Sequence, residues 1–563
     1  MKEALLFFLC LLGINFLVFL PHWIIGLFLN NNPKNKAEKE QGFTHITKTI
    51  IYKRFTNDFF RFSAEIQVLI ILFLISNVLP DFFKMAITLM ATFGFVYVTY
   101  ISSIISVFKK DPVLTNDIEF AKTGFMAYRN KAKLALFSAI LVTVIVSVCF
   151  YFLTDLLIST SLKFHYKGVI LCFIVMSLAL SAYSIKKMRY DFYMSAINFS
   201  IIRHFILNLN RSNQLKNSLK SLNYQKPYSY VNEIKPLKHP NIIFLSLESY
   251  GEIALQDEKV KHCVIDKLKQ LDKVLQKKGW LSASTLSKSP ISSGGSWISH
   301  SCLFYGAKVK DNAAHDLIYT KTDFVSQLES LPKFFKNHGY KTTSTATLSY
   351  NQNEVNWEKV NNLYPFDELM LIEDFDYKGK TVPIFGNRDT LPDEYTLNYA
   401  YQKHLGQSPF FLFVNTTNSH YSFYSPTKAL EDWNAYNSED FQLTDGLKKN
   451  AIKNYTTAIN YHFDYLEKFI LNIDLDDTII VLFGDHQPPF ITNNNSNKDT
   501  PIHIISKNEN FVNAFEYKAG LIPEKSTQNH EAFFSIFLNA FNKAYGKSPE
   551  LETPIFKDGI NLY

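Results

Sequence analysis

Five long apolar segments occupy the first third of the chain. They cover residues 3–29, 64–80, 84–108, 133–157 and 167–185. A helix that crosses a bilayer needs about 20 mostly apolar residues, and these segments approach or exceed that length. A buried core helix is the alternative for any single segment, but five of them in one third of a 563-residue chain favour a membrane domain. The sequence therefore predicts a transmembrane domain over residues 1–185 with about five helices.

The charged residues between these segments indicate how the chain is oriented across the membrane. Basic residues are concentrated in the loops 30–63 and 109–132 and directly after residue 185. The positive-inside rule would place all three regions on the cytoplasmic face, and with five spans the rest of the chain would follow them there. The second segment is the weakest span because it is short and contains Glu65 and Gln67. The span count, and with it this orientation, is therefore open.

The rest of the chain has the mixed composition of a soluble domain, preceded by a linker over residues 186–237. In Tyr190–Leu209, apolar residues recur at helical spacing among Arg and Asn. This pattern predicts an amphipathic helix on the bilayer surface or, alternatively, a linker helix packed on the soluble domain. The net charge is only +7, and the Lys and Arg residues are spread along the chain. Nucleic acid is therefore not an expected partner.

From residue 241 onward, strand-like and helix-like patterns alternate. Phe410–Asn415 is typical of a strand and Asn454–Leu471 of a helix. Ser330–His338 is predicted to be a short helix, with Ser330 as N-cap and Gly339 just beyond its end. Such alternation predicts an α/β domain around a mostly parallel central sheet.

Two apolar strand-like segments end in side chains that bind metals. Asn241–Leu247 runs straight into Glu248, and Thr478–Gly484 runs into Asp485 and His486. Apolar runs of this kind are typical of strands buried in a parallel sheet. Open α/β sheets place their sites at the carboxyl ends of the strands. We therefore expect the three side chains to meet over a divalent metal, although more than 230 residues separate the two segments.

Between these segments lies a Ser- and Gly-rich stretch, Ser292–Gly306, which contains Ser296 and His300. A serine at the start of a helix is well placed for phosphoryl chemistry, because the free N–H groups and the helix dipole favour an anion there. Coordination to a divalent metal would lower the pKa of its hydroxyl. Taken alone, the stretch could equally be a simple capping loop.

These motifs together resemble the alkaline-phosphatase/sulfatase superfamily. The run from Gly484 through Asp485 and His486 to Gln-Pro-Pro is the most specific of them, and Leu247-Glu248-Ser249 supports it. The chain is most similar to the membrane-bound branch of lipoteichoic-acid synthases, phosphoethanolamine transferases and phosphoglycerol transferases. The resemblance implies a sulfatase-like catalytic domain over residues 238–563, behind the membrane domain and the linker.

In that branch, a Glu, a Thr or Ser nucleophile and an Asp-His pair hold the metal. The resemblance thus assigns metal binding to Glu248, Ser296, Asp485 and His486, with Ser296 as the catalytic nucleophile. The spacing of ten residues to Gly306 favours Ser296, whereas a slightly longer spacing would point to Ser293 or Ser292. The Pro and Arg required for formylglycine modification are replaced by Ile298 and His300, so an unmodified hydroxyl is expected.

Further residues are implied in substrate binding. They are His300, Trp357, Lys359, His420 and His530. His420 follows the strand Phe410–Asn415 and would contact the transferred phosphate as a catalytic residue, although a lone His at such a place is often a polar loop residue. Trp357 and Lys359 match an aromatic-basic pair that holds the head group in lipoteichoic-acid synthases. His530 precedes the last long helix and could equally be a helix cap.

The implied activity is transfer of a phospho-head group, phosphoglycerol or phosphoethanolamine, from a membrane phospholipid to an envelope glycan or lipid. The cofactor would be one or two divalent metal ions, Zn²⁺ or Mn²⁺. A hydrolase that uses water as acceptor, sulfatase or phosphodiesterase, and an inactive sensor on the same fold are the alternatives. Because acceptors of this class are envelope molecules, the resemblance implies a bacterial cytoplasmic-membrane protein with an external catalytic domain. The charge pattern of the loops argues the opposite orientation.

Overall fold

The structure is a computed structural model of the chain, and it divides into two compact units. The first comprises residues 1–117 and 129–214, and the second residues 118–128 and 215–563. The described residues are 2–30, 63–118 (without 77, 109–111 and 116), 129–163, 168, 171–172, 174–175, 200–220 and 228–561. Within the last range, the gaps are 310–313, 316–317, 319–324, 350–356, 385–387, 408, 439, 447–449, 474–476, 490, 492–497 and 525–527.

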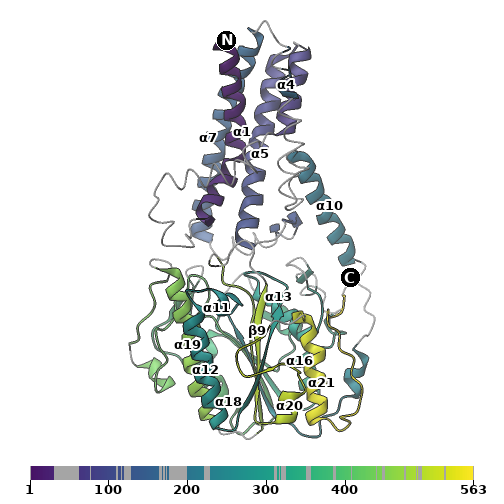
Figure 1. Cartoon of the computed structure of the whole chain (residues 1–563), viewed down its shortest axis with the longest axis vertical. Helices are drawn as coiled ribbons and strands as arrows, with labels where there is room; N and C mark the ends of the chain where they lie inside the picture. Colours follow the sequence, from purple (N-terminus) through teal and green to yellow (C-terminus); the bar gives the residue numbers. More distant parts are fainter. Residues whose placement is uncertain are drawn as a thin grey trace. The chain divides into compact units, whose positions relative to one another are not determined.

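The first unit is a bundle of apolar helices. They are α1 (Lys2–Asn30), α4 (Ala64–Ser76), α5 (Pro80–Phe108) and α7 (Arg129–Leu162), and α1, α5 and α7 pack against one another while α4 packs on α5 (Figure 1). Among the described residues, stretches of α1, α5 and α7 are long and apolar enough to cross a membrane. The segment predicted at 64–80 is helical but forms only the 13-residue α4. The segment predicted at 167–185 lies almost entirely outside the described residues, so the number of five spans stays a prediction.

A further helix, α10 (Ile201–Lys220), belongs to the same unit. Glu65 of α4 accepts hydrogen bonds at the start of α10 from the Ile202 amide, at 3.0 Å, and from the Ser200 hydroxyl. His204 of α10 pairs with Tyr97 of α5 at 2.8 Å. The part of the predicted surface helix that the structure describes, from Ile201 onward, therefore packs on the apolar helices through polar contacts.

The second unit is built on an eight-stranded sheet with the order β10-β2-β9-β8-β1-β7-β3-β4. Strands β8, β1, β7, β3 and β4 are parallel neighbours, whereas β9, β2 and β10 pair antiparallel. The bounds are β1 (Asn241–Leu247), β2 (Leu281–Lys288), β3 (Lys341–Ala346), β4 (Glu368–Met370), β7 (Phe410–Asn415), β8 (Thr478–Gly484), β9 (Asp499–Ser506) and β10 (Lys518–Ala519). A separate hairpin joins β5 (Val382–Ile384) to β6 (Arg388–Thr390). The predicted α/β domain with a mostly parallel sheet is confirmed.

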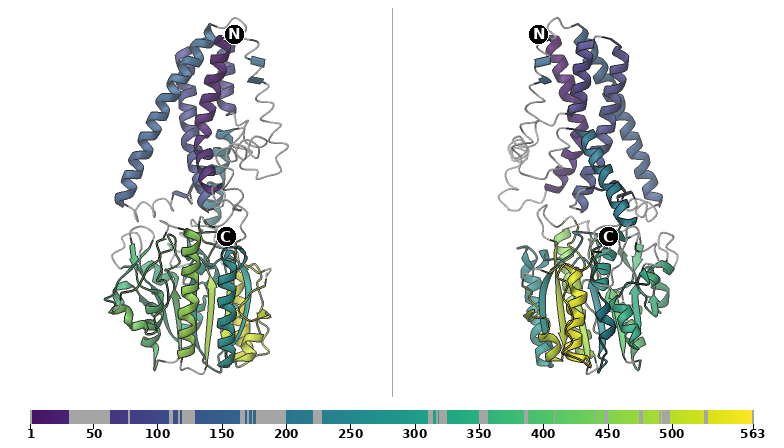
Figure 2. Two further views of the ribbon diagram at one scale, coloured as in Figure 1. Left: turned by 60° about the vertical axis from the view of Figure 1, so that its left-hand side comes forward. Right: turned by 90° about the vertical axis from the view of Figure 1, so that its right-hand side faces the viewer.

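Helices cover both faces of this sheet (Figure 1, Figure 2). One layer contains α11 (Ile253–Gln256), α12 (Lys261–Lys277), α18 (Asp393–His404) and α19 (Ala451–Asn472), and the other contains α13 (Ser296–Tyr305), α16 (Leu331–Asn337), α20 (Glu509–Asn513) and α21 (Phe533–Tyr545). The short elements are α17 (Trp357–Leu363), η1 (Ser229–Glu233), η2 (Ile372–Asp374), η3 (Trp433–Asn437) and η5 (His530–Ala532). The predicted helices near 330–338 and 454–471 are confirmed as α16 and α19.

The apolar character of the central strands follows from this layering. Every residue of β1 and of β8 is buried, as expected for strands with helices on both faces. Phe244 of β1 packs on Phe411 and Phe537 in one core, while the adjacent Leu245 belongs to the core on the opposite face. Glu248, Asp485 and His486 follow directly after these two apolar strands.

Candidate metal centre

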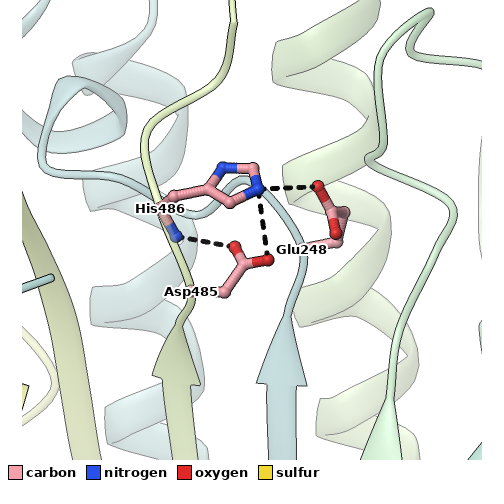
Figure 3. A group of neighbouring side chains, drawn as sticks. All are labelled: Glu248, Asp485 and His486. Atoms are coloured by element: carbon pink, nitrogen blue, oxygen red, sulfur yellow. Dashed lines mark hydrogen bonds and ion pairs between the residues drawn. The ribbon is translucent and has the colours of Figure 1, made fainter. Parts of the chain in front are cut away.

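The register of two neighbouring strands brings the predicted ligands together. Leu247 of β1 pairs with Gly484 of β8, so Glu248 and Asp485 leave the sheet side by side. His486 Nε2 lies 3.5 Å from Glu248 Oε1 and 3.4 Å from Asp485 Oδ2 (Figure 3). One ligand atom from each residue falls within 4.8 Å of the others, and all three side chains are buried. The predicted convergence of these three residues is present in the structure.

Hydrogen bonds fix the orientation of each acceptor. The backbone amides of Ser249 and His486 donate to Asp485 Oδ1 at 2.8 and 2.7 Å. The Ser249 hydroxyl donates to Glu248 Oε1 at 2.8 Å. His486 Nδ1 lies 2.9 Å from the Gln487 carbonyl, which can only accept, so Nδ1 carries a proton. The other ring nitrogen, Nε2, therefore faces the two carboxylates.

The electrostatics of the cluster fit a divalent cation. Burial, together with the charge of Glu248, raises the pKa of Asp485. Burial opposes ionisation of Glu248 too, but the charges of His420 and His486 outweigh it and hold the pKa of Glu248 below its usual value. Within the described part of the chain, Asp485 Oδ2 is buried without a hydrogen-bond donor. A cation among these atoms would satisfy that oxygen and offset the crowded carboxylates.

Ser296 completes the cluster from the other side. It is the first residue of α13, and its hydroxyl lies 3.3 Å from Glu248 Oε2 and 3.4 Å from His486 Nε2. The preceding glycines, Gly294 and Gly295, have φ angles of 64° and 82°, a left-handed turn that side chains disfavour. Of the alternatives, Ser292 contributes its carbonyl oxygen, which accepts from the Gln487 amide at 3.2 Å. The helix start thus directs the Ser296 hydroxyl at the predicted ligands.

His420 lies in the loop after β7, the strand next to β1 on the opposite side from β8. The preceding residue, Ser419, donates to the Glu248 carbonyl at 2.5 Å, which places His420 near the cluster. Its Nδ1 atom lies 2.6 Å from the Tyr421 carbonyl, so the proton sits on Nδ1. Nε2 is then the atom that can face a ligand.

Two of the predicted substrate-binding histidines, His300 and His530, are buried against the sheet. His300 of α13 pairs with Ser246 of β1 at 2.7 Å, and burial lowers the pKa of His300 to about 4. His530 contacts Ser287 at 3.0 Å and the Gly484 carbonyl at 3.3 Å, and burial lowers the pKa of His530 to about 4. Both imidazoles are therefore neutral at pH 7, and the contacts described are with the protein. Their substrate-binding role stays a prediction.

Trp357 and Lys359 occupy the first turn of α17. The Trp357 indole nitrogen is buried and finds no acceptor among the residues that the structure describes. Residues 350–356, which precede this turn and belong to the same predicted binding stretch, lie outside the described residues. The head-group role of this pair stays a prediction.

Several polar residues near the cluster gave no signal in the sequence. Ser419 donates to the Glu248 carbonyl at 2.5 Å and pairs with His462 of α19 at 2.7 Å. Asp393, at the start of α18, accepts from the backbone amides of Thr417 and Asn418 at 2.9 and 2.8 Å. His462 lies in the amphipathic helix α19, where the spacing of apolar and polar residues does not distinguish one histidine from the other polar residues. The sequence pattern therefore could not predict its contact with Ser419.

Solved structures with similar folds include three bacterial proteins. The chain is 13% identical to the lipooligosaccharide phosphoethanolamine transferase EptA from Neisseria meningitidis, with a TM-score of 0.47 and 94% of each chain covered. It is 15% identical to the lipoteichoic acid synthase LtaP from Listeria monocytogenes, with a TM-score of 0.37, covering 62% of this chain and 81% of that one. It is 13% identical to the phosphoglycerol transferase GacH from Streptococcus pyogenes, with a TM-score of 0.38 and coverage of 61% and 86%.

Sequence comparison gives a direct family assignment. Comparison with curated protein sequences gives no match. The sequence profile of the sulfatase family, however, matches residues 240–541. This range starts at β1, ends in α21 and includes Glu248, Ser296, Asp485 and His486. Because the match covers more than half of the chain, the protein belongs to the sulfatase family.

Proposed function

We propose that this protein transfers a phospho-head group, phosphoglycerol or phosphoethanolamine, from a membrane phospholipid to an envelope glycan or lipid. The observation that supports this most is the placement of Ser296. Its hydroxyl opens a helix and lies within 3.4 Å of a buried carboxylate and a buried imidazole. A hydroxyl in such a place is suited to attack a phosphate rather than to cap a loop.

The proposed transfer uses a divalent metal ion, and the residues that would hold it are Glu248, Asp485, His486 and Ser296. Mixed carboxylate and imidazole donors suit Zn²⁺ or Mn²⁺. Such an ion, when bound, lowers the pKa of a neighbouring hydroxyl and offsets the negative charge of a phosphate. In this proposal Glu248 and Asp485 supply the negative charge of the site, and the proton on Nδ1 of His486 keeps Nε2 available as a donor atom.

The chain's own groups would carry the transfer in two steps. The Ser296 oxygen attacks the phosphorus of the lipid head group, the P–O bond to diacylglycerol breaks, and the proton lost by the Ser296 hydroxyl ends on the diacylglycerol oxygen. The N-terminus of α13 and a His420 that is also protonated at Nε2, and so donates from that atom, would stabilise the charge on the phosphoryl oxygens. A hydroxyl of the acceptor then attacks the phospho-seryl group and regenerates Ser296. The apolar helices of the first unit would keep the donor lipid at high effective concentration.

Intact-mass measurement after incubation with lipid extract tests this proposal. We expect one added phospho-head group, mapped by peptide analysis to Ser296, with the added mass identifying the head group. Ser296→Ala should abolish the adduct, and Ser293→Ala, the matched control in the same loop, should retain it. An adduct on Ser293 or Ser292 would contradict the choice of nucleophile. Release of the free head group into water without any acceptor product would instead support a hydrolase.

A further inference from the structure

A buried chain of hydrogen bonds connects α19 to the backbone of the metal centre. It runs from Tyr465 through His462 and Ser419 to the Glu248 carbonyl, and we call it the His462 chain. His462 Nδ1 lies 2.8 Å from the Tyr465 hydroxyl, and Nε2 lies 2.7 Å from the Ser419 hydroxyl. Ser419 in turn donates to the Glu248 carbonyl at 2.5 Å. Ser419 and His462 are fully buried.

We propose that Ser419 and His462 are positioning residues, which hold the Glu248 ligand and the phosphate-contacting His420 in one fixed relation. This inference rests on the function proposed above. Ser419 reaches both groups at once, because its hydroxyl holds the backbone of Glu248 and its own backbone continues directly into His420. A shift of Ser419 would therefore move a metal ligand and a phosphate contact together.

The hydrogens of the His462 chain can be arranged in only one way. Two oxygens 2.5 Å apart need a hydrogen between them, and a carbonyl has none, so the Ser419 proton points at Glu248. Ser419 must then accept from His462, which places the ring proton on Nε2. Nδ1 is left as an acceptor for the Tyr465 hydroxyl. A chain with a single proton arrangement fixes the imidazole orientation, because the alternative tautomer would break two buried hydrogen bonds.

A carboxylate holds the same loop from its other side. Asp393 accepts from Thr417 and Asn418, the two residues before Ser419. Its Oδ2 atom is 3.9 Å from His462 Nδ1, which is too long for a hydrogen bond. Burial lowers the pKa of His462 to about 3, so the imidazole is neutral and this contact is not an ion pair. The loop that leads to His420 is thus fixed by α18 and α19 together.

The test compares two buried serines that each pair with a histidine and a tyrosine. Ser284 lies 2.7 Å from His503 Nδ1, and His503 Nε2 lies 3.2 Å from the Tyr250 hydroxyl. Ser284 is on β2 and makes no contact with the Glu248 carbonyl. Ser284→Ala therefore removes a buried Ser–His hydrogen bond without touching the His462 chain, and serves as the matched control for Ser419→Ala.

Three properties of the full-length protein in detergent are measured. They are the dissociation constant for Zn²⁺ alone, by chelator competition, the melting temperature, and kcat and KM for the lipid donor. We expect Ser419→Ala to weaken Zn²⁺ binding by about 10- to 100-fold, the usual effect of losing a residue that orients a ligand. Its kcat should fall while KM for the lipid donor stays unchanged. Ser284→Ala should lower the melting temperature as much as Ser419→Ala does, but leave the Zn²⁺ dissociation constant and kcat as in the parent.

Equal Zn²⁺ binding and equal kcat in the two variants would overturn the inference. If Ser419→Ala does not fold, Tyr465→Phe decides, because it removes only the donor that fixes the His462 tautomer. A lower kcat in Tyr465→Phe supports the inference, and parental values for kcat and Zn²⁺ binding overturn it. A parent protein that binds no Zn²⁺ refutes the metal centre and this inference with it. A parent that binds Zn²⁺ without forming a phospho-seryl adduct refutes only the proposed transfer.

Discussion

The side chains of Glu248, Asp485 and His486 are crowded in a way that a protein interior rarely tolerates without a cation. Two buried carboxylates lie within 3.5 Å of the same imidazole nitrogen. Burying a charge is costly unless it is paired or coordinates a metal. This argument depends on three positions only, and each can be changed separately.

We expect Glu248→Ala or Asp485→Ala to weaken metal binding by more than about 100-fold, beyond the usual effect of losing a supporting residue. The physical reason is the loss of one of two anionic ligands in a buried site. Metal content after dialysis, measured by elemental analysis, checks this. Glu258→Ala is the control, because that carboxylate is exposed and pairs with Lys261 on the surface. A Glu248→Ala protein with parental metal content and turnover would contradict the assignment.

At the level of single elements, the ends of helices and strands decide where chemistry is placed. β1 and β8 are in register at Leu247 and Gly484, so their ends bring two candidate ligands, Glu248 and Asp485, to one point. The start of α13 delivers Ser296 to the same point. The short helix α16 shows that such local signals can be read from sequence, because Ser330 caps it as predicted by accepting from the Lys333 amide.

Ser330→Ala should lower the free energy of unfolding by about 1 kcal/mol, because a buried N-cap acceptor is lost. Ser330→Thr keeps the hydroxyl and is the matched control, with a smaller expected loss. Thermal unfolding of both variants in the same detergent measures the difference. Ser330 is remote in sequence from the metal ligands, so metal content should stay parental in both proteins. An unchanged melting temperature in Ser330→Ala would show that the capping bond contributes nothing.

For the whole molecule, two opposing arguments bear on the side of the membrane on which the catalytic domain lies. Stretches of α1, α5 and α7 are long and apolar enough to span. The basic loops favour a cytoplasmic domain, whereas envelope acceptors require an external one. We propose the external orientation, because the charge rule is statistical and the transfer proposed above would require the domain to reach an envelope acceptor.

A reporter fusion after Tyr563 tests this orientation. Alkaline-phosphatase activity from that position is the expected result, and fluorescence from a fluorophore that folds only in the cytoplasm would contradict it. A second fusion in the loop 109–132 is the companion experiment. Two spans, 133–157 and 167–185, are predicted between these positions, so both reporters should lie on the same side. Opposite sides would mean that only one of the two segments crosses.

The sequence alone determined the features that depend on neighbouring residues. Apolar runs identified β1, β7 and β8, because a strand covered on both faces needs apolar side chains throughout. The Asp-His and Glu motifs at the ends of these strands predicted the candidate metal ligands, since a parallel sheet brings its carboxyl ends to one edge. Through the resemblance to the sulfatase pattern, the spacing to Gly306 favoured Ser296, and its hydroxyl lies 3.3 Å from Glu248 and 3.4 Å from His486.

Only the tertiary structure decided the hydrogen-bond partners of the buried histidines. His300 and His530 were expected to bind substrate, and the structure buries them against the sheet, where they contact Ser246 and Gly484. His462 carried no signal, because its partners Ser419 and Tyr465 come from a distant loop and from its own helix. The physical reason is that hydrogen bonds between distant residues leave no periodicity in the sequence, whereas burial of a strand or a helix face does.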